Sequence, residues 1–177
     1  MNEIDYFGIF RRMVALKGKA VLEIGGCVPF ELIAKAGVAK WVSTDINHKR
    51  LDNRRANERP NWYELVINDA SIMPFGPCSV DCVYSINTFE HVLDLESCID
   101  NIFRVLKPGG LFFTKFAPIW SSQRGHHMWV WHKGKAVTFN DDIIPGWHHL
   151  SHGQRDLKEM LDKRIDGDLS KKIIDYV

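Results

Sequence analysis

The sequence predicts an α/β fold with a doubly wound, mostly parallel sheet. Short apolar runs alternate with segments of helical pattern along the first two-thirds of the 177 residues. One such run, 20–24, leads into Gly25 and Gly26, and an apolar helical segment follows from Phe30. Asp45 ends the next apolar run. A strand–glycine–helix unit brings backbone amides close to a ligand, and an acid at the next strand tip can accept hydrogen bonds from a ribose. These observations predict a nucleoside-cofactor fold.

The elements of this fold can be placed by apolar spacing and by turn residues. In chain order we expect a helix over 3–15, strands over 20–24, 40–44, 63–67, 80–85 and 111–116, and helices over 30–39 and 95–105 between them. The polar segment 49–58 is compatible with a helix, and Lys107-Pro108-Gly109-Gly110 predicts a turn. Beyond these, a helix is expected over 151–164, and 173–177 looks like a strand or helix that has barely begun.

The glycine loop alone leaves the cofactor open. A dinucleotide fold requires G-x-G-x-x-G, and from Gly25 the third and sixth positions are Cys27 and Phe30. Glu31 would oppose a pyrophosphate at the helix start, whereas Glu23 suits a cationic ligand such as S-adenosylmethionine. The same glycines could equally form an ordinary tight turn, with Glu23 as a solvated strand end.

Five stretches in order favour a cofactor. They are VLEIGGCVPFELIAKAG, VSTDIN, INDASIMPF, DCVYSINTFEHV and RVLKPGGLFFTKFAP. In these stretches the sequence resembles the class I S-adenosylmethionine-dependent methyltransferases, specifically the ubiquinone/menaquinone-type methyltransferase domain group, over residues 18–118. It departs from that family's E/D-x-G-x-G-x-G loop at Cys27 and Pro29.

The resemblance implies a role for nine residues near the strand ends. Glu23, Gly25 and Gly26 would hold the methionine end of S-adenosylmethionine. Asp45 would accept from the ribose hydroxyls and Ile46 would pack on the adenine. Asp69 and the Ala70 amide would meet adenine nitrogens, although Asp-Ala-Ser is also good turn chemistry. Ser85 and Asn87 would lie beneath the sulfonium, and His91 is expected to be structural.

Residues 119–152 differ in character from the rest of the chain. They hold four of the six tryptophans and six of the eight histidines, in no regular pattern. We expect an acceptor pocket there, walled by Trp120, Trp129 and Trp131. His126 is the preferred general base, narrowly over His127, because it follows Gly125 in what looks like an exposed loop. The histidines do not form the H-E-x-x-H arrangement of a zinc-binding helix, so no metal is predicted.

Composition and charge argue against nucleic-acid and membrane partners. The net charge of +1 and the absence of a basic stripe argue against nucleic acid, and no apolar run reaches membrane-spanning length. The N-terminus does not read as a signal peptide, so we expect a cytoplasmic protein. One domain is predicted, with a cofactor-binding core over 1–118 and an acceptor-side region with a C-terminal helix over 119–177.

The C-terminal region is too short for the family's two further strands, so these antiparallel strands should be short or missing. Either the chain is a truncated form, or strand 111–116 is an edge, covered by the aromatic segment or by the partner subunit of a homodimer. The predicted activity is methyl transfer from S-adenosylmethionine to a small-molecule acceptor, with a hydroxyl of a sugar or metabolite favoured. The alternatives are a non-catalytic cofactor-binding or scaffold protein and, disfavoured by the glycine spacing, an NAD-type oxidoreductase.

Overall fold

The computed structural model describes residues 2–26, 28–47 and 60–177. The chain divides into two compact units, Met1–Phe116 and Ala117–Val177, and each is described separately. Cys27 and the predicted helical segment 49–58 lie outside the described residues.

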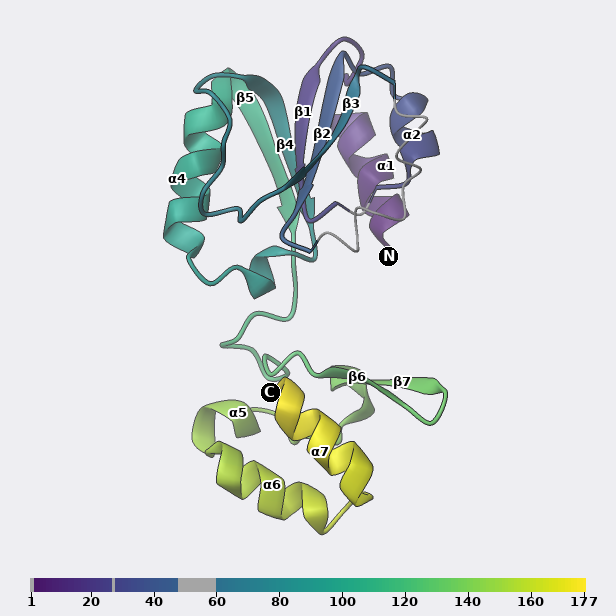
Figure 1. The fold of residues 1–177 in the computed structure, drawn as a ribbon, viewed down its shortest axis with the longest axis vertical. Coiled ribbons are helices and arrows are strands. Elements are labelled where there is room, and N and C mark those ends of the chain that lie inside the picture. Colours follow the sequence, from purple (N-terminus) through teal and green to yellow (C-terminus); the bar gives the residue numbers. More distant parts are fainter. Residues whose placement is uncertain (1, 27, 48–59) are drawn as a thin grey trace. The chain divides into compact units, whose positions relative to one another are not determined.

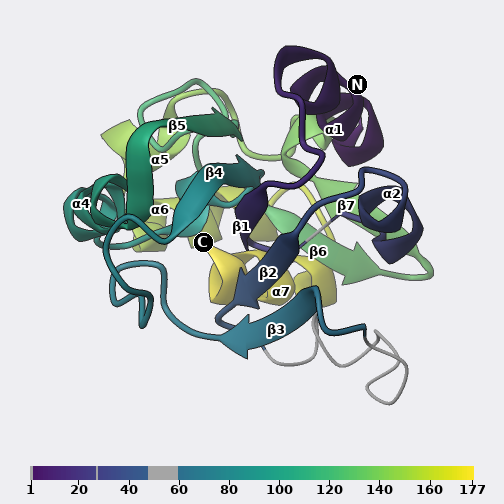
Figure 2. The ribbon, with the colours of Figure 1, turned by 90° about the horizontal axis from the view of Figure 1, so that it is seen from above.

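The first unit is built on one parallel sheet of five strands. These are β1 (Ala20–Ile24), β2 (Lys40–Asp45), β3 (Tyr63–Ile67), β4 (Val80–Ile86) and β5 (Leu106–Lys115). Their order in the sheet is β3-β2-β1-β4-β5, and every neighbouring pair is parallel (Figures 1 and 2). The reversal of strand order at β1 and β4 is the doubly wound arrangement, so the predicted fold class is confirmed.

Helices cover both faces of this sheet. Helices α1 (Glu3–Met13) and α2 (Phe30–Ala34) lie on one face and α4 (Leu95–Val105) on the other (Figure 1). The alternation of side chains along β1 divides the core accordingly. Val21 packs with the α1 and α2 side chains, whereas Leu22 packs with those of α4.

Two elements of this unit differ from their predicted limits. Helix α2 ends at Ala34 rather than at residue 39, and Gly37 follows with a φ of +67°. Strand β5 begins at Leu106, before the predicted turn. Its pairing with β4 jumps from Val80↔Leu106 to Cys82↔Leu111, so the Lys-Pro-Gly-Gly segment is a bulge within the strand. The turn residues were recognised, but the strand resumes on both sides of them.

The second unit corrects the prediction that residues 119–152 lack regular structure. Strands β6 (Trp129–His132) and β7 (Lys135–Thr138) form an antiparallel hairpin, separate from the main sheet. Its two-residue turn has positive φ at Lys133 (+47°) and Gly134 (+79°), which matches the twist of a hairpin. The sequence predicts that the C-terminal antiparallel strands of the main sheet are short or missing. The hairpin is the only antiparallel pair among the described residues, and it does not belong to that sheet.

Helices complete the second unit. They are α5 (His148–Ser151), α6 (Gln154–Asp162) and α7 (Gly167–Tyr176). Each unit also has one short 3-10 turn, η2 (Phe89–His91) in the first and η3 (Phe139–Asp141) in the second. The prediction that the C-terminal segment had barely begun an element is wrong. Helix α7 starts at Gly167 because the Asp166 side chain caps it, accepting a hydrogen bond from the Leu169 N–H at 3.1 Å.

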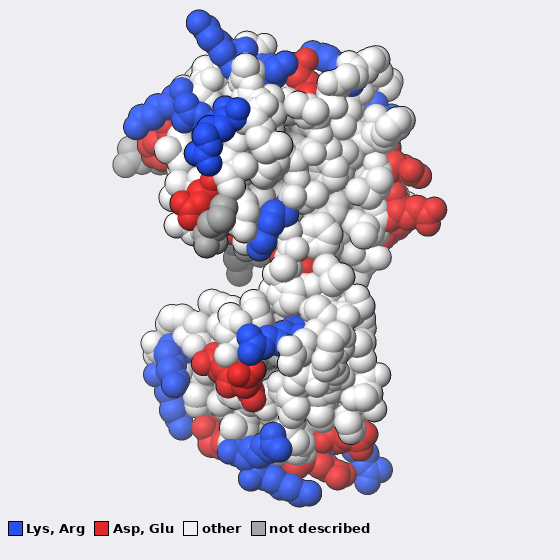
Figure 3. Space-filling model, turned by 180° about the vertical axis from the view of Figure 1, so that it is seen from behind, with Lys and Arg blue, Asp and Glu red and all other residues white. Residues whose placement is uncertain are grey.

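Two features of the structure concern possible partners: the charge of its surface, and the length and hydropathy of its helices. On the face drawn in Figure 3, both units carry basic as well as acidic side chains. None of the helices in the described ranges combines the length and the apolar character of a membrane-spanning segment.

Candidate cofactor site

A cavity of about 330 Å³ opens in the first unit where β1, β2, β3 and β4 end. This is the position at which open α/β sheets bind ligands. Six of the nine residues expected to contact the cofactor line it: Gly25, Asp45, Ile46, Asp69, Ala70 and Asn87. The other three, Glu23, Gly26 and Ser85, are not among its lining residues and are fully buried.

Gly25 lets the backbone turn closely beneath the η2 turn. Its φ is +90°, and its N–H donates to the Thr44 carbonyl at 2.8 Å. A Cβ added at this position would lie 1.9 Å from Thr88 Oγ1. Only glycine satisfies both the backbone angle and this close approach, so the cavity floor depends on it.

Glu23 faces the protein interior rather than the cavity, which corrects its expected contact with the methionine end. Its Oε1 accepts from the Val28 N–H at 2.7 Å, and its Oε2 accepts from Trp41 Nε1–H at 2.9 Å and from the Ser43 hydroxyl. Val28 comes just after the glycines. The carboxylate therefore holds the glycine loop from below, tying it to β2.

Ser85 is likewise a support. Its hydroxyl donates to the Ile24 carbonyl at 3.0 Å, which joins the ends of β4 and β1. Asn87, by contrast, lines the cavity with a left-handed φ of +52°. Its N–H donates to the Lys115 carbonyl at 2.8 Å, and its Oδ1 accepts from Lys115 Nζ at 3.0 Å. Lys115 thus fixes the direction of this amide.

Two carboxylates lie at the cavity and are held differently. Asp45 ends β2 and is buried, and its Oδ1 accepts from the Asn47 N–H at 2.7 Å. Asp69 is exposed, and its Oδ1 accepts from both the N–H and the hydroxyl of Ser71 at 2.8 Å. These hydrogen bonds lower the pKa of Asp69 below its usual range. Asp69 therefore has the turn role that its sequence context allowed, at a position that also borders the cavity.

Comparison with known proteins decides the family. A family model described as "Methyltransferase domain" matches residues 22–114, more than half of the chain. The chain belongs to the methyltransferase domain family.

Named relatives of this methyltransferase domain include sterol enzymes. A 24-methylenesterol C-methyltransferase from Oryza sativa subsp. japonica is 34% identical over 106 residues, which make up 56% of this chain and 29% of that protein. A sterol 24-C-methyltransferase from Aspergillus fumigatus is 36% identical over 102 residues, 54% of this chain and 27% of that protein. The chain spans less than a third of the length of these curated relatives.

A solved structure shares the fold. The S-adenosylmethionine-dependent methyltransferase from Mesorhizobium loti superposes with a TM-score of 0.58 over 96% of this chain and 79% of its own, at 18% identity. Identity at this level shows the fold alone.

The methyltransferase fold implies S-adenosylmethionine as cofactor, and the cavity residues fit it. Asp45 brings a carboxylate to the cavity, and Gly25 allows close backbone approach. Asn68 lines the same cavity, and its buried Oδ1 accepts no hydrogen bond from the described residues. A buried amide oxygen of this kind favours a ligand that donates, such as an amino or hydroxyl group.

Sequence reasoning missed several lining residues of the methyltransferase cavity. They are Ile24, Thr44, Asn47, Asn68, Thr88, His91, Val92 and Leu93. Thr44, Asn47 and Asn68 adjoin the predicted acids, so their position next to a strand end was an available signal. Nothing in the sequence indicated that Thr88 folds back over Gly25. His91, expected to be structural, borders the cavity.

The proposed bases lie in the second unit, and His126 is not in an exposed loop. It is 4% exposed, and its Nδ1 accepts from the Met128 N–H at 3.2 Å. Burial, followed by nearby positive charge, lowers the pKa of His126 to about 4. His127 is half-buried, and its ring lies 5.0 Å from that of Phe139.

The three tryptophans expected to share one acceptor pocket are not brought together. Trp129 and Trp131 are neighbours on the outer face of β6, with ring centroids 6.2 Å apart. Trp120 instead meets His149 edge-on at 4.8 Å and borders a second cavity of about 330 Å³ that contains neither of the other two.

Proposed function

We propose that the chain binds S-adenosylmethionine in the cavity of its first unit and transfers the methyl group to a small-molecule acceptor. The observation that carries this proposal is the placement of Asp45 and Asn68 at adjacent strand ends beside the close-approach glycine, Gly25. When bound, the cofactor supplies a methyl group already activated by its sulfonium. The protein's part is then to orient the reactants and to exclude water.

Several residues would do this work. Asp45 accepts from a ribose diol, while Ile46 and Ala70 give apolar contact next to it. Glu23 and Ser85 act through the backbone, holding the glycine loop and the end of β1 in place. Asn87, oriented by Lys115, presents its amide at the end of β4.

For the acceptor we propose a hydroxyl of a sugar or metabolite, which requires a base. His126 and His127 are the proposed bases. Because His126 accepts the Met128 N–H at Nδ1, its Nε2 carries the proton and has no lone pair to receive another. For His126 to accept a proton, this hydrogen bond must first break.

A second acceptor class is an electron-rich carbon. It is favoured by the relatives described as sterol C-methyltransferases. Turnover assays with hydroxylated metabolites and with sterols, each with labelled cofactor, distinguish the two. Cofactor binding without turnover on either set would instead support the scaffold alternative.

The cofactor site is tested by calorimetry with S-adenosylhomocysteine. Replacing Asp45 by Ala removes the ribose acceptor and should weaken binding by about 1–3 kcal/mol, roughly 5- to 150-fold. Asp45→Asn, which keeps one acceptor oxygen, should fall in between. Asp100→Ala on the exposed side of α4 is the matched control and should bind as the parent does. Unchanged affinity in Asp45→Ala, or binding of NAD in place of S-adenosylhomocysteine, refutes the assignment.

Two further expectations accompany this function. Strand β5 is an edge of the sheet among the described residues, and we propose that a second copy of the chain covers it. Sedimentation velocity measures whether the chain forms a dimer, and a monomer would contradict this proposal. We also propose a cytoplasmic location and no nucleic-acid partner.

A further inference from the structure

A histidine occupies a core-facing position in the hairpin of the second unit. Along β6 the side chains alternate, with Trp129 and Trp131 exposed and Val130 and His132 buried. His132 is only 4% exposed, and its neighbour on the same face of the strand is the buried, apolar Val130. A buried imidazole in such a position needs polar partners.

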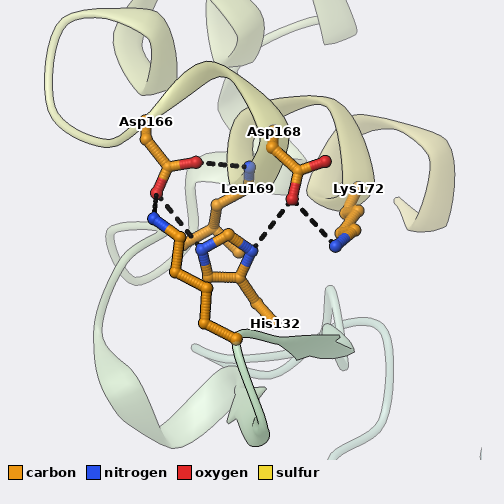
Figure 4. A network of polar contacts seen from close by, with 6 residues as sticks. His132, Asp166, Asp168, Leu169 and Lys172 are labelled. Carbon is orange, nitrogen blue, oxygen red and sulfur yellow. Dashed lines mark hydrogen bonds and ion pairs between the residues drawn. The ribbon is translucent and has the colours of Figure 1, made fainter.

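Two carboxylates at the start of α7 supply those partners (Figure 4). His132 Nε2 lies 3.2 Å from Asp166 Oδ2, and its Nδ1 lies 3.2 Å from Asp168 Oδ2. Asp166 is the N-cap of α7 and Asp168 is in its first turn. Each ring nitrogen therefore faces its own carboxylate oxygen.

This geometry selects one protonation state of the ring. A neutral imidazole has one N–H and one lone pair, so it can donate to only one of the two carboxylates. The other contact would then set a lone pair against an anion. Both contacts are attractive only when both nitrogens carry protons, that is, in the imidazolium form.

The surrounding charges keep the two carboxylates ionised. Lys133 Nζ lies 3.3 Å from Asp166 and Lys172 Nζ lies 2.9 Å from Asp168, while Lys135 is opposite His132 across the hairpin. The pKa of Asp166 is lowered mainly by the Leu169 N–H, and the pKa of Asp168 mainly by Lys172, with His132 contributing to both. The carboxylates are thus charged throughout the range in which an ordinary histidine titrates.

We propose that His132, Asp166 and Asp168 form a proton-dependent bridge that fixes the start of α7 to β6. Protonation of the ring completes two ion pairs, and its loss sets a lone pair of the ring against one of the two carboxylates. Helix α7 also contributes Leu169 and Ile173 to the core of the second unit. Loss of the proton therefore loosens the packing of this helix as the pH rises, which makes the bridge a pH-sensitive switch.

The same three side chains could be considered as ligands of a divalent cation. A cation would need one ring nitrogen and both carboxylates at a single point. Here the carboxylates address opposite nitrogens of the ring, and each already pairs with a lysine. The arrangement favours a proton over a metal ion.

Hydrogen exchange of the α7 amides in the full chain tests the bridge. After correction for intrinsic exchange, protection should be about tenfold higher at low pH, where the ring is protonated, than at high pH, where it is neutral. In His132→Gln this fall should disappear. In His152→Gln, which removes an exposed histidine of the same unit, the fall should persist.

A second variant covers the case in which His132→Gln does not fold. Asp166→Asn keeps the cap to Leu169 but removes one charge, so the fall in protection should shrink. An undiminished fall in His132→Gln or in Asp166→Asn overturns the proposal. So does protection of α7 that rises with added Zn²⁺, is reversed by EDTA and is absent from Asp166→Asn, because that result identifies a metal site.

Discussion

The two units each bury a titratable side chain in a strand, and the groups that surround it differ in kind. In the first unit, Glu23 of β1 accepts hydrogen bonds from a backbone amide, an indole and a hydroxyl, all uncharged donors. In the second, His132 of β6 lies between two carboxylates. Donors such as those around Glu23 do not titrate near neutral pH, whereas an imidazole does.

This difference separates the roles of the two units. The network around Glu23 supports the loop that shapes the proposed cofactor cavity, and its geometry does not depend on the protonation of its donors. The network around His132 controls how a helix packs. We therefore expect the proposed cofactor site to keep its shape across neutral pH, whereas the packing of helix α7 in the second unit changes with pH.

The largest expected effect comes from removing the support of the first unit. Glu23→Ala leaves three buried donors without their acceptor and should lower the free energy of unfolding by about 3–5 kcal/mol. Glu64→Ala is the matched control in the same sheet, because Glu64 is half-exposed and pairs with Lys40 at the surface. It should cost less than about 1 kcal/mol. Urea denaturation measures both, and similar losses in the two variants contradict the role of Glu23.

Sequence patterns located the first unit well because its elements are bounded by strong local signals. The limits of β1, β3 and α4 match their predicted limits, since apolar runs there meet Gly, Asn or Asp at their ends. What sequence could not show is the direction of Glu23. An acid at a strand end was expected to face the ligand, but Glu23 lies on the same face of β1 as Val21 and meets Trp41 and Ser43 of the neighbouring strand. That choice depends on register across the sheet.

The second unit was harder to predict because its signals conflict. Two outward tryptophans made β6 look like an unpatterned aromatic run, although the Lys-Gly turn and the alternation were present in the sequence. Similarly, the start of α7 was missed because the cap at Asp166 was not considered. The pairing of His132 with Asp166 and Asp168 joins residues more than thirty positions apart, so only the folded chain reveals it.

The glycine loop gives the next largest effect. Gly25→Ala forces a Cβ into Thr88 Oγ1 at a backbone angle unfavourable for alanine, and we expect a loss of about 2–3 kcal/mol in unfolding free energy together with weaker S-adenosylhomocysteine binding. Adding Thr88→Ala removes the hydroxyl but keeps its Cβ, so it should recover only part of the loss. Gly134→Ala, at a positive φ with open space around it, isolates the backbone contribution in the second unit. A loss in Gly25→Ala no greater than in Gly134→Ala would show that the close approach to Thr88 is unimportant.

The smallest expected effect is on the pH dependence of stability, to which two histidines of the second unit contribute in opposite directions. Because burial lowers the pKa of His126 to about 4, the unfolded chain takes up a proton below about pH 6.5 that the folded chain refuses. His126 should therefore cost stability on the order of 1–3 kcal/mol as the pH falls from about 6.5 to 4. The bridge at His132 acts in the opposite direction, because it weakens as the pH rises.

Urea unfolding followed by tryptophan fluorescence can resolve these two signs, since four of the six tryptophans lie in the second unit. His126→Gln should flatten the acid side of the stability profile and leave the alkaline side unchanged, whereas His132→Gln should do the reverse. His152→Gln provides the control, because His152 is exposed and its Nδ1 contacts the Ser151 hydroxyl. If both variants changed the same side of the profile, the two histidines would belong to one coupled network, and the contrast drawn between a fixed and a proton-dependent unit would have to be replaced by a single titrating core.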